Sequence, residues 1–124
     1  MSAAREYYIE NRVARIEWRM DRRERCMLCG WEGTKSRDGM RWLEIHEIER
    51  RSLASRRWAD PCNYLLLCNL CHRDRIPLMS RAEELAIKWA GDPENFDLDR
   101  WLRLRDPELR APLRVTMEDI EEYL

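Results

Sequence analysis

The stretch YLLLCNLCH, Tyr64–His72, joins a short apolar run to a Cys-x-x-Cys pair and a histidine. The apolar run predicts a buried strand or the entry to a helix. Cys68 and Cys71 have the spacing that lets both sulfurs reach one tetrahedral ion. A second pair with the same spacing, Cys26 and Cys29, lies upstream, and 38 residues separate the two pairs. Two such pairs predict a structural zinc site, with four unligated thiols as the alternative.

A metal ion held by both pairs would close the segment between them into a loop. In a chain of 124 residues such a clip contributes much of the folding energy. Gly30, directly after the first pair, eases the backbone turn there. The fifth cysteine, Cys62, is predicted to be a small buried hydrophobic residue.

Length and composition indicate one compact domain without a global basic field, since the net charge is −1. The N-terminal sequence MSAAREYYIE has no apolar run, so we expect neither a signal peptide nor a membrane anchor, and a cytoplasmic protein. Cysteines in such a protein favour metal binding over disulfides.

Basic residues are concentrated in the first half of the chain, where positions 1–58 carry 14 basic and 10 acidic residues. Any nucleic-acid face is therefore expected there. Only Lys35 and Lys88 are lysines among the 23 basic residues. Guanidinium groups bind phosphate in a bidentate manner, although a GC-rich genome would give the same composition.

Residues 3–25 are predicted to form one amphipathic helix, because Ile9, Val13, Ile16 and Met20 are spaced 4, 3 and 4 and form a single stripe. Arginines alternate with acidic residues on its other faces. Two interpretations stay open: a surface helix with i,i+4 charge pairs, or a helix laid along a DNA backbone.

The rest of the chain is predicted as a strand over MRWLEIH (40–46), an Arg-rich loop, and a helical C-terminal part after Pro77. Helix ends are predicted from capping boxes, Asp-Pro pairs and a stop glycine. The residues concerned are Ser80 with Glu83, Gly91, Asp92, Asp106, and Thr116 with Asp119. The single domain 1–124 thus divides into an N-terminal helix (1–25), a middle segment (26–76) and a helical extension (77–124).

The motifs LEIHEI (Leu43–Ile48), DPCNYLLLC (Asp60–Cys68) and CH (Cys71–His72), together with the two cysteine pairs, resemble the zinc-knuckle subgroup of the HNH endonuclease family. The resemblance covers about Cys26 to Ile76. It implies an α+β fold: a mostly helical small domain around a ββα-metal finger, stapled by a four-cysteine zinc site. In such a finger a two-stranded hairpin is joined to a helix, with a divalent ion between them.

The resemblance also implies roles for individual residues. His46 matches the first ligand of the catalytic ion, which is Mg²⁺, Mn²⁺ or another divalent ion, and His72 matches the last ligand. Asn63 matches the asparagine that braces the loop by bonding to backbone near the base. Four arginines in the connecting loop would contact phosphate, or form a solvated loop: Arg50, Arg51, Arg56 and Arg57.

Glu47 departs from the family pattern, which places a histidine there as general base. Three interpretations follow: Glu47 is itself the base, it is a third metal ligand, or the site has lost its base and kept the fold. Glu44 is expected to orient a ligand. Two further departures are Ile76, where some members carry a polar ligand, and Pro77, which shortens the helix that holds His72.

We therefore expect a metal-dependent DNA endonuclease that nicks or cleaves phosphodiester bonds, with involvement in phage or mobile-element DNA processing suggested by resemblance alone. The alternative is a catalytically degenerate zinc module that binds DNA or a protein partner. A metal-dependent hydrolase acting on another substrate is a third interpretation. No residue pattern indicates the oligomeric state.

Overall fold

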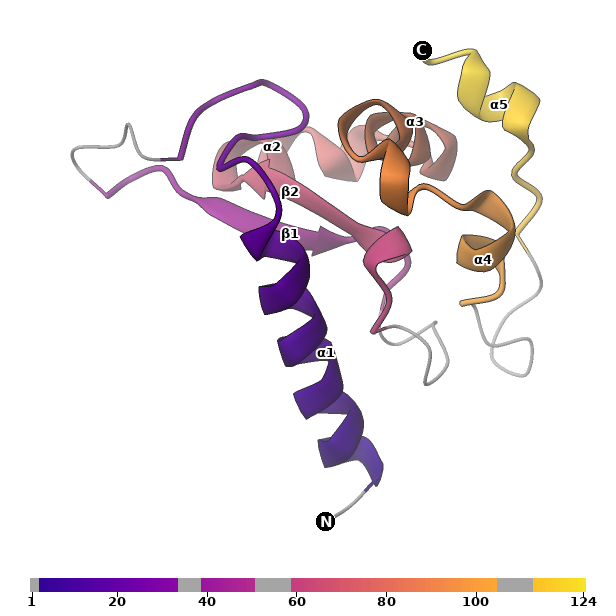
Figure 1. Ribbon diagram of the computed structural model, residues 1–124. Coiled ribbons are helices and arrows are strands. Elements are labelled where there is room, and N and C mark those ends of the chain that lie inside the picture. Colours follow the sequence, from indigo (N-terminus) through magenta and orange to yellow (C-terminus); the bar gives the residue numbers. More distant parts are fainter. Residues whose placement is uncertain (1–2, 34–38, 51–58, 105–112) are drawn as a thin grey trace.

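The centre of the fold is a two-stranded antiparallel sheet in which β1 (Leu43–Glu47) pairs with β2 (Tyr64–Cys68). Leu43 lies opposite Cys68 and His46 opposite Leu65. β2 is buried along its whole length, as a continuous apolar run requires, so the expected buried strand is confirmed and the helix-entry alternative is wrong. Figure 1 shows the helices arranged around this hairpin.

The structure, a computed structural model, describes residues 3–33, 39–50, 59–104 and 113–124. Its helices are α1 (Ala3–Met20), α2 (Asn69–Asp74), α3 (Arg81–Gly91), α4 (Leu98–Leu102) and α5 (Met117–Glu121). Three short 3-10 turns accompany them: η1 (Pro61–Asn63), η2 (Ile76–Leu78) and η3 (Pro93–Asn95). The protein is thus a small α+β domain, as expected. Within the described ranges no helix combines the length and apolar character needed to cross a membrane.

The strand β2 passes directly into α2, because Cys68 ends the strand and caps the helix. Its sulfur accepts a hydrogen bond from the backbone of Cys71. α2 is short, as the proline at position 77 predicts, and η2 follows it. The next helix, α3, begins after Ser80, and the predicted capping box of Ser80 with Glu83 is confirmed. The predicted capping box of Thr116 with Asp119 at the start of α5 is also confirmed.

Two other expectations for the C-terminal part have mixed outcomes. Asp92 is the N-cap residue of a helical turn, η3, but its carboxylate accepts from the side chains of Lys88 and Asn95 and not from the backbone of the turn. The corresponding prediction for Asp106 lies outside the described residues.

Cys62 is buried in the core, as predicted.

The N-terminal helix is shorter than predicted, and the face that it buries is not the apolar stripe. It ends at Met20 instead of residue 25, because the following segment folds back through a bridge between Arg25 and Glu32. Among the side chains of α1 that the structure describes, those of Asn11 and Trp18 are buried. Trp18 packs edge-on against Tyr64, with ring centroids 5.6 Å apart, so a tryptophan on the polar side anchors α1 to the sheet.

A buried ion pair joins α3 to the hairpin and to α1. The Lys88 ammonium donates to Asp92 Oδ2 and to the backbone oxygens of Pro61 and Tyr64, each at 2.7 Å. Burial lowers the pKa of Lys88, and these three acceptors satisfy its three donors. Trp18 Nε1 donates to the same Asp92 oxygen at 2.8 Å, so the Lys88–Asp92 pair links α3, the hairpin and α1.

Replacement of Lys88 by methionine should lower the free energy of unfolding by about 3 kcal/mol or more, because the buried Asp92 keeps only Arg22 as a charged partner and two backbone oxygens lose their donor. Urea unfolding followed by circular dichroism measures the change. Arg73→Met is the matched control: Arg73 pairs with Asp74, both side chains are exposed, and stability should not change. Equal effects of the two substitutions would contradict a central role for the buried pair.

Candidate functional site

Four cysteine sulfurs converge at one end of the hairpin. Those of Cys26, Cys29, Cys68 and Cys71 all lie within 4.8 Å of one another, and none forms a disulfide. Cys29 Sγ and Cys68 Sγ are 3.8 Å apart, which is close to the separation of about 3.8 Å given by tetrahedral zinc–thiolate bonds of about 2.3 Å. The quartet could therefore hold a metal ion, and its geometry is compatible with structural zinc.

Backbone hydrogen bonds hold the first cysteine pair beside β2. Met27 N donates to Leu66 O at 2.9 Å, and Cys26 N donates to Trp31 O at 2.8 Å. The turn between Cys26 and Trp31 requires a residue in the left-handed backbone conformation, and Gly30 supplies it at φ +82°. A side chain at position 30 would also meet the guanidinium of Arg25 at 2.8 Å.

Positive charge and hydrogen bonds stabilise thiolate character in the quartet. Arg41 Nη2 lies 3.2 Å from Cys29 Sγ and 3.5 Å from Cys68 Sγ. Burial disfavours the Cys68 thiolate, but hydrogen bonds from the Cys71 backbone and from Arg41 outweigh it and lower the pKa of Cys68 to about 6. Burial raises the pKa of the neighbouring Cys71 thiol. Four thiolates at this spacing therefore need a cation to be charged together.

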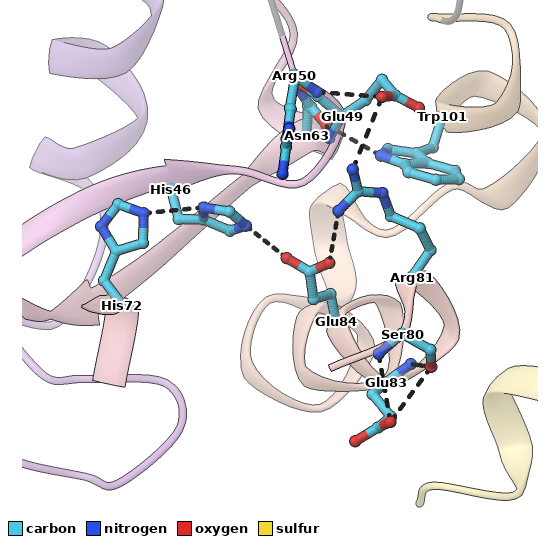
Figure 2. Close-up of polar contacts among 10 residues, drawn as sticks. All are labelled: His46, Glu49, Arg50, Asn63, His72, Ser80, Arg81, Glu83, Glu84 and Trp101. Atoms are coloured by element: carbon cyan, nitrogen blue, oxygen red, sulfur yellow. Dashed lines mark hydrogen bonds and ion pairs between the residues drawn. The ribbon is translucent and has the colours of Figure 1, made fainter. Parts of the chain in front are cut away.

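The two histidines contact each other between β1 and α2, and His72 directly follows Cys71 of the quartet. His46 comes from β1 and His72 from α2, and His46 Nδ1 lies 3.1 Å from His72 Nε2 (Figure 2). The rings are edge-on, with centroids 4.8 Å apart. Residues 26 positions apart in the chain thus present two ring nitrogens to one small space.

A carboxylate binds the outer nitrogen of each histidine. Glu44 Oε1 lies 2.6 Å from His72 Nδ1, and Glu84 Oε1 lies 2.5 Å from His46 Nε2. When each outer N–H donates to its carboxylate, both inner nitrogens present lone pairs to each other. Two acceptors at 3.1 Å repel each other unless a proton or a metal ion is shared between them. Carboxylates on the outer nitrogens are also the usual partners of metal-bound histidines.

Glu84 was not expected at the site. It is fully buried in α3, and its second oxygen accepts from Arg81 at 2.9 Å, so His46 and Arg81 together hold it in place. In the sequence, Glu84 lies four residues before Lys88, the spacing of a solvated ion pair. The one available signal was its position beside the apolar Leu85 and Ala86. The structure instead gives Glu84 and Lys88 separate buried partners.

Asn63 braces the turn after β1. Its Oδ1 accepts from Glu49 N at 2.7 Å and from Trp101 Nε1 at 2.9 Å, while its Nδ2 donates to Glu49 O at 3.0 Å. Asn63 is fully buried, so these bonds occupy its amide in a dry environment. The two contacts with the Glu49 backbone hold the turn after β1 against the start of β2. Arg81 lies between Glu49 and Glu84 and pairs with both carboxylates (Figure 2). Its Nη2 is 3.9 Å from Glu49 Oε1.

The structure does not bring Glu47 to the histidine pair. Successive strand residues point to opposite faces, so Glu47 faces α1 whereas Glu44 and His46 face α2 and α3. Its Oε1 forms an ion pair with Arg15 and accepts from Asn11 Nδ2 at 3.4 Å. Its side chain is only 8% exposed. Glu47 therefore links the hairpin to the N-terminal helix.

The arginines expected to contact phosphate are only partly described. Arg50 is exposed, and its backbone N donates to Glu49 Oε1 at 3.1 Å. Arg51, Arg56 and Arg57 lie outside the described residues.

Across the described ranges, the cysteine quartet is the group in which three or more candidate ligand atoms come together. The histidine pair supplies two, since its carboxylates lie on the outer nitrogens. Compared with protein-family models, with curated proteins and with solved structures, the chain matches none of them. Functional inference therefore depends on the geometry of these side chains.

Replacement of Cys71 by serine should abolish stoichiometric metal binding, because a hydroxyl is a poor substitute for a thiolate ligand. The wild-type protein is expected to contain one zinc per chain, measured by inductively coupled plasma mass spectrometry after dialysis. Cys62→Ser is the matched control, since Cys62 is equally buried but lies outside the quartet. Metal-free wild-type protein, or unchanged zinc content in Cys71→Ser, would contradict the assignment.

Proposed function

We propose that this protein is a divalent-metal-dependent DNA endonuclease whose ion binds between His46 and His72. One observation carries the proposal: two inner ring nitrogens face each other at 3.1 Å, and each outer nitrogen is bound by a carboxylate. The order β1, β2, α2, with one histidine from a strand and one from a helix, agrees with the ββα-metal finger that the sequence motifs suggest.

The spacing of the two nitrogens fits one ion. Two ligands at about 2.1 Å from a cation are about 3.0 Å apart in octahedral geometry and about 3.4 Å apart in tetrahedral geometry. The observed 3.1 Å lies within this interval. The His72 side chain is one-third exposed, so a phosphodiester can approach from solvent. Such an ion stabilises the charge that develops on a phosphodiester during hydrolysis and makes a nearby water more acidic.

The remaining residues of the site position the two histidines. Glu44 and Glu84 fix the ring orientations, and the bidentate contact of Asn63 with the Glu49 backbone holds the end of β1. Zinc in the cysteine quartet would fix the start of α2, directly before His72. Arg50 and Arg75 are exposed and would supply positive charge for the DNA backbone.

The contacts of Glu47 favour a structural role over the roles of base or metal ligand. Its carboxylate is paired with Arg15 on the face of β1 opposite the histidines. This observation also supports the second candidate function, a non-catalytic zinc module that binds DNA or a protein partner through the same scaffold. The two functions differ in whether the paired histidines bind a divalent ion and whether the protein then cleaves a phosphodiester bond.

Replacement of His72 by alanine should reduce nicking of supercoiled plasmid by more than about a hundredfold, because one of two ligands of the ion is lost. Zinc-loaded wild-type protein should convert supercoiled to open-circular plasmid in Mg²⁺ or Mn²⁺, measured on agarose gels. Glu94→Ala, at an exposed residue of the turn η3 after α3, is the control and should nick at the wild-type rate.

Binding of the second ion is measured separately by titrating Mn²⁺ into zinc-loaded protein and following its paramagnetic resonance signal. One site per chain that disappears in His72→Ala is expected. An intact plasmid with every divalent ion tried, despite Mn²⁺ binding, would reject catalysis and leave the non-catalytic module. An intact plasmid without Mn²⁺ binding would reject the ion site as well.

The variant Glu47→Gln should retain nicking within about threefold of wild type, because Glu47 faces away from the histidines. It should lose about 1–3 kcal/mol of unfolding free energy, since Arg15 then lacks a charged partner in a largely buried contact. A fall in nicking of about a hundredfold or more with normal Mn²⁺ binding would instead identify Glu47 as the general base. Loss of Mn²⁺ binding would identify it as a ligand.

A further inference from the structure

The helix α1 carries an apolar stripe that the described part of the chain leaves uncovered. Its members Ile9, Val13, Ile16 and Met20 are 41%, 47%, 53% and 78% exposed. Figure 1 shows α1 extending away from the hairpin towards the N-terminus. Four large apolar side chains in one continuous row are more than scattered surface residues, and such rows mark interaction surfaces.

The opposite face of α1 attaches the helix to its own domain. Asn11 and Trp18 are buried, Trp18 bonds to Asp92, and Arg15 pairs with Glu47. In a heptad in which Val13 and Met20 are a positions and Ile9 and Ile16 are d positions, residues 11 and 18 are f positions. The f position lies opposite the a/d stripe. The stripe therefore points directly away from the domain that holds the helix.

The charges that border the stripe are sorted by sign. Glu10 and Glu17 occupy e positions beside the stripe, and Arg12 and Arg19 occupy g positions. Glu10, Arg12 and Glu17 are exposed, while Arg19 bonds to Glu24 of its own chain. In a parallel pair of helices a g residue faces the e residue five positions later in the partner, so arginine would meet glutamate. In an antiparallel pair g faces g, and arginine would meet arginine.

We propose that the protein forms a parallel homodimer in which the α1 stripes of two copies pack against each other as a short coiled coil. The 4, 3, 4 spacing supplies the a/d seam, and charge complementarity selects a second copy in parallel orientation. Each domain is attached to the outward f face, so the two domains lie on opposite sides of the helix pair.

The seam from Ile9 to Met20 spans less than two heptads of an 18-residue helix, and a free peptide of this length would be marginal as a helix. Here each α1 is already held in helical form by its contacts with the sheet. Pre-organisation of this kind removes the ordering entropy that a free peptide would lose. Val13 and Ile16, at the middle of the seam, should therefore dominate the association.

The test is sedimentation equilibrium of the full-length, zinc-loaded chain from about 1 to 200 µM. Wild-type protein should show a monomer–dimer equilibrium, and Val13→Glu should be monomeric throughout, since it buries a charge in the seam. Glutamate has a higher helix propensity than valine, so α1 should persist, which circular dichroism checks. Leu78→Glu, at the most exposed large apolar residue outside α1 in the described ranges, is the control and should dimerise normally.

Orientation is tested by a charge-reversal cycle. Arg12→Glu and Glu17→Arg should each weaken association roughly tenfold, because two attractive pairs per dimer become repulsive. The double variant should restore the wild-type constant. In an antiparallel dimer each single variant would instead strengthen association, because Arg12→Glu would turn an Arg–Arg contact into an attractive pair and Glu17→Arg would do the same for a Glu–Glu contact. A wild type that stays monomeric up to about 200 µM, a dimer that survives Val13→Glu, or single variants without rescue would each overturn the proposal.

Discussion

Four thiolates within 4.8 Å of one another cannot all be charged without a cation, and the middle of the chain is built to bring them together. The first pair is held to β2 by the bond from Met27 to Leu66, and the second pair is the junction of β2 with α2. A metal ion at this point would therefore lock a strand end, a helix start and a remote turn at once. Such an ion would also help to fix the direction of α2.

The position of the histidine pair follows from that junction. Leu43 lies opposite Cys68, so the start of β1 is fixed beside the quartet and His46 lies three residues along the strand. His72 directly follows the last cysteine on α2. The register of the sheet then decides that these two rings meet, and a slip of one residue would turn His46 to the other face. Glu44, on the same face, reaches His72 for the same reason.

Features set by local chemistry could be predicted from the sequence. The capping boxes at Ser80 and Thr116, the cysteine pairs and the strand at residues 64–68 depend on neighbouring residues, and each is present. The partners of Glu84 and Glu47 depend on which face of an element is buried, and this is decided by distant packing. The apolar stripe of α1 does not show which face of the helix is buried, for the same reason. The helix is oriented by a buried tryptophan, Trp18, on its polar side, and the apolar row stays exposed.

The two faces of β1 connect the proposed site to the proposed interface. His46 looks towards α2 and α3, whereas Glu47, the next residue, holds Arg15 of α1. The strand that carries one histidine therefore also fixes the rotation of α1, and with it the direction of the exposed stripe. A second copy bound along that stripe would be held at a defined distance and orientation from the first. Since one ion site attacks one phosphodiester at a time, a rigid pair of sites is the arrangement that could address both strands of a duplex.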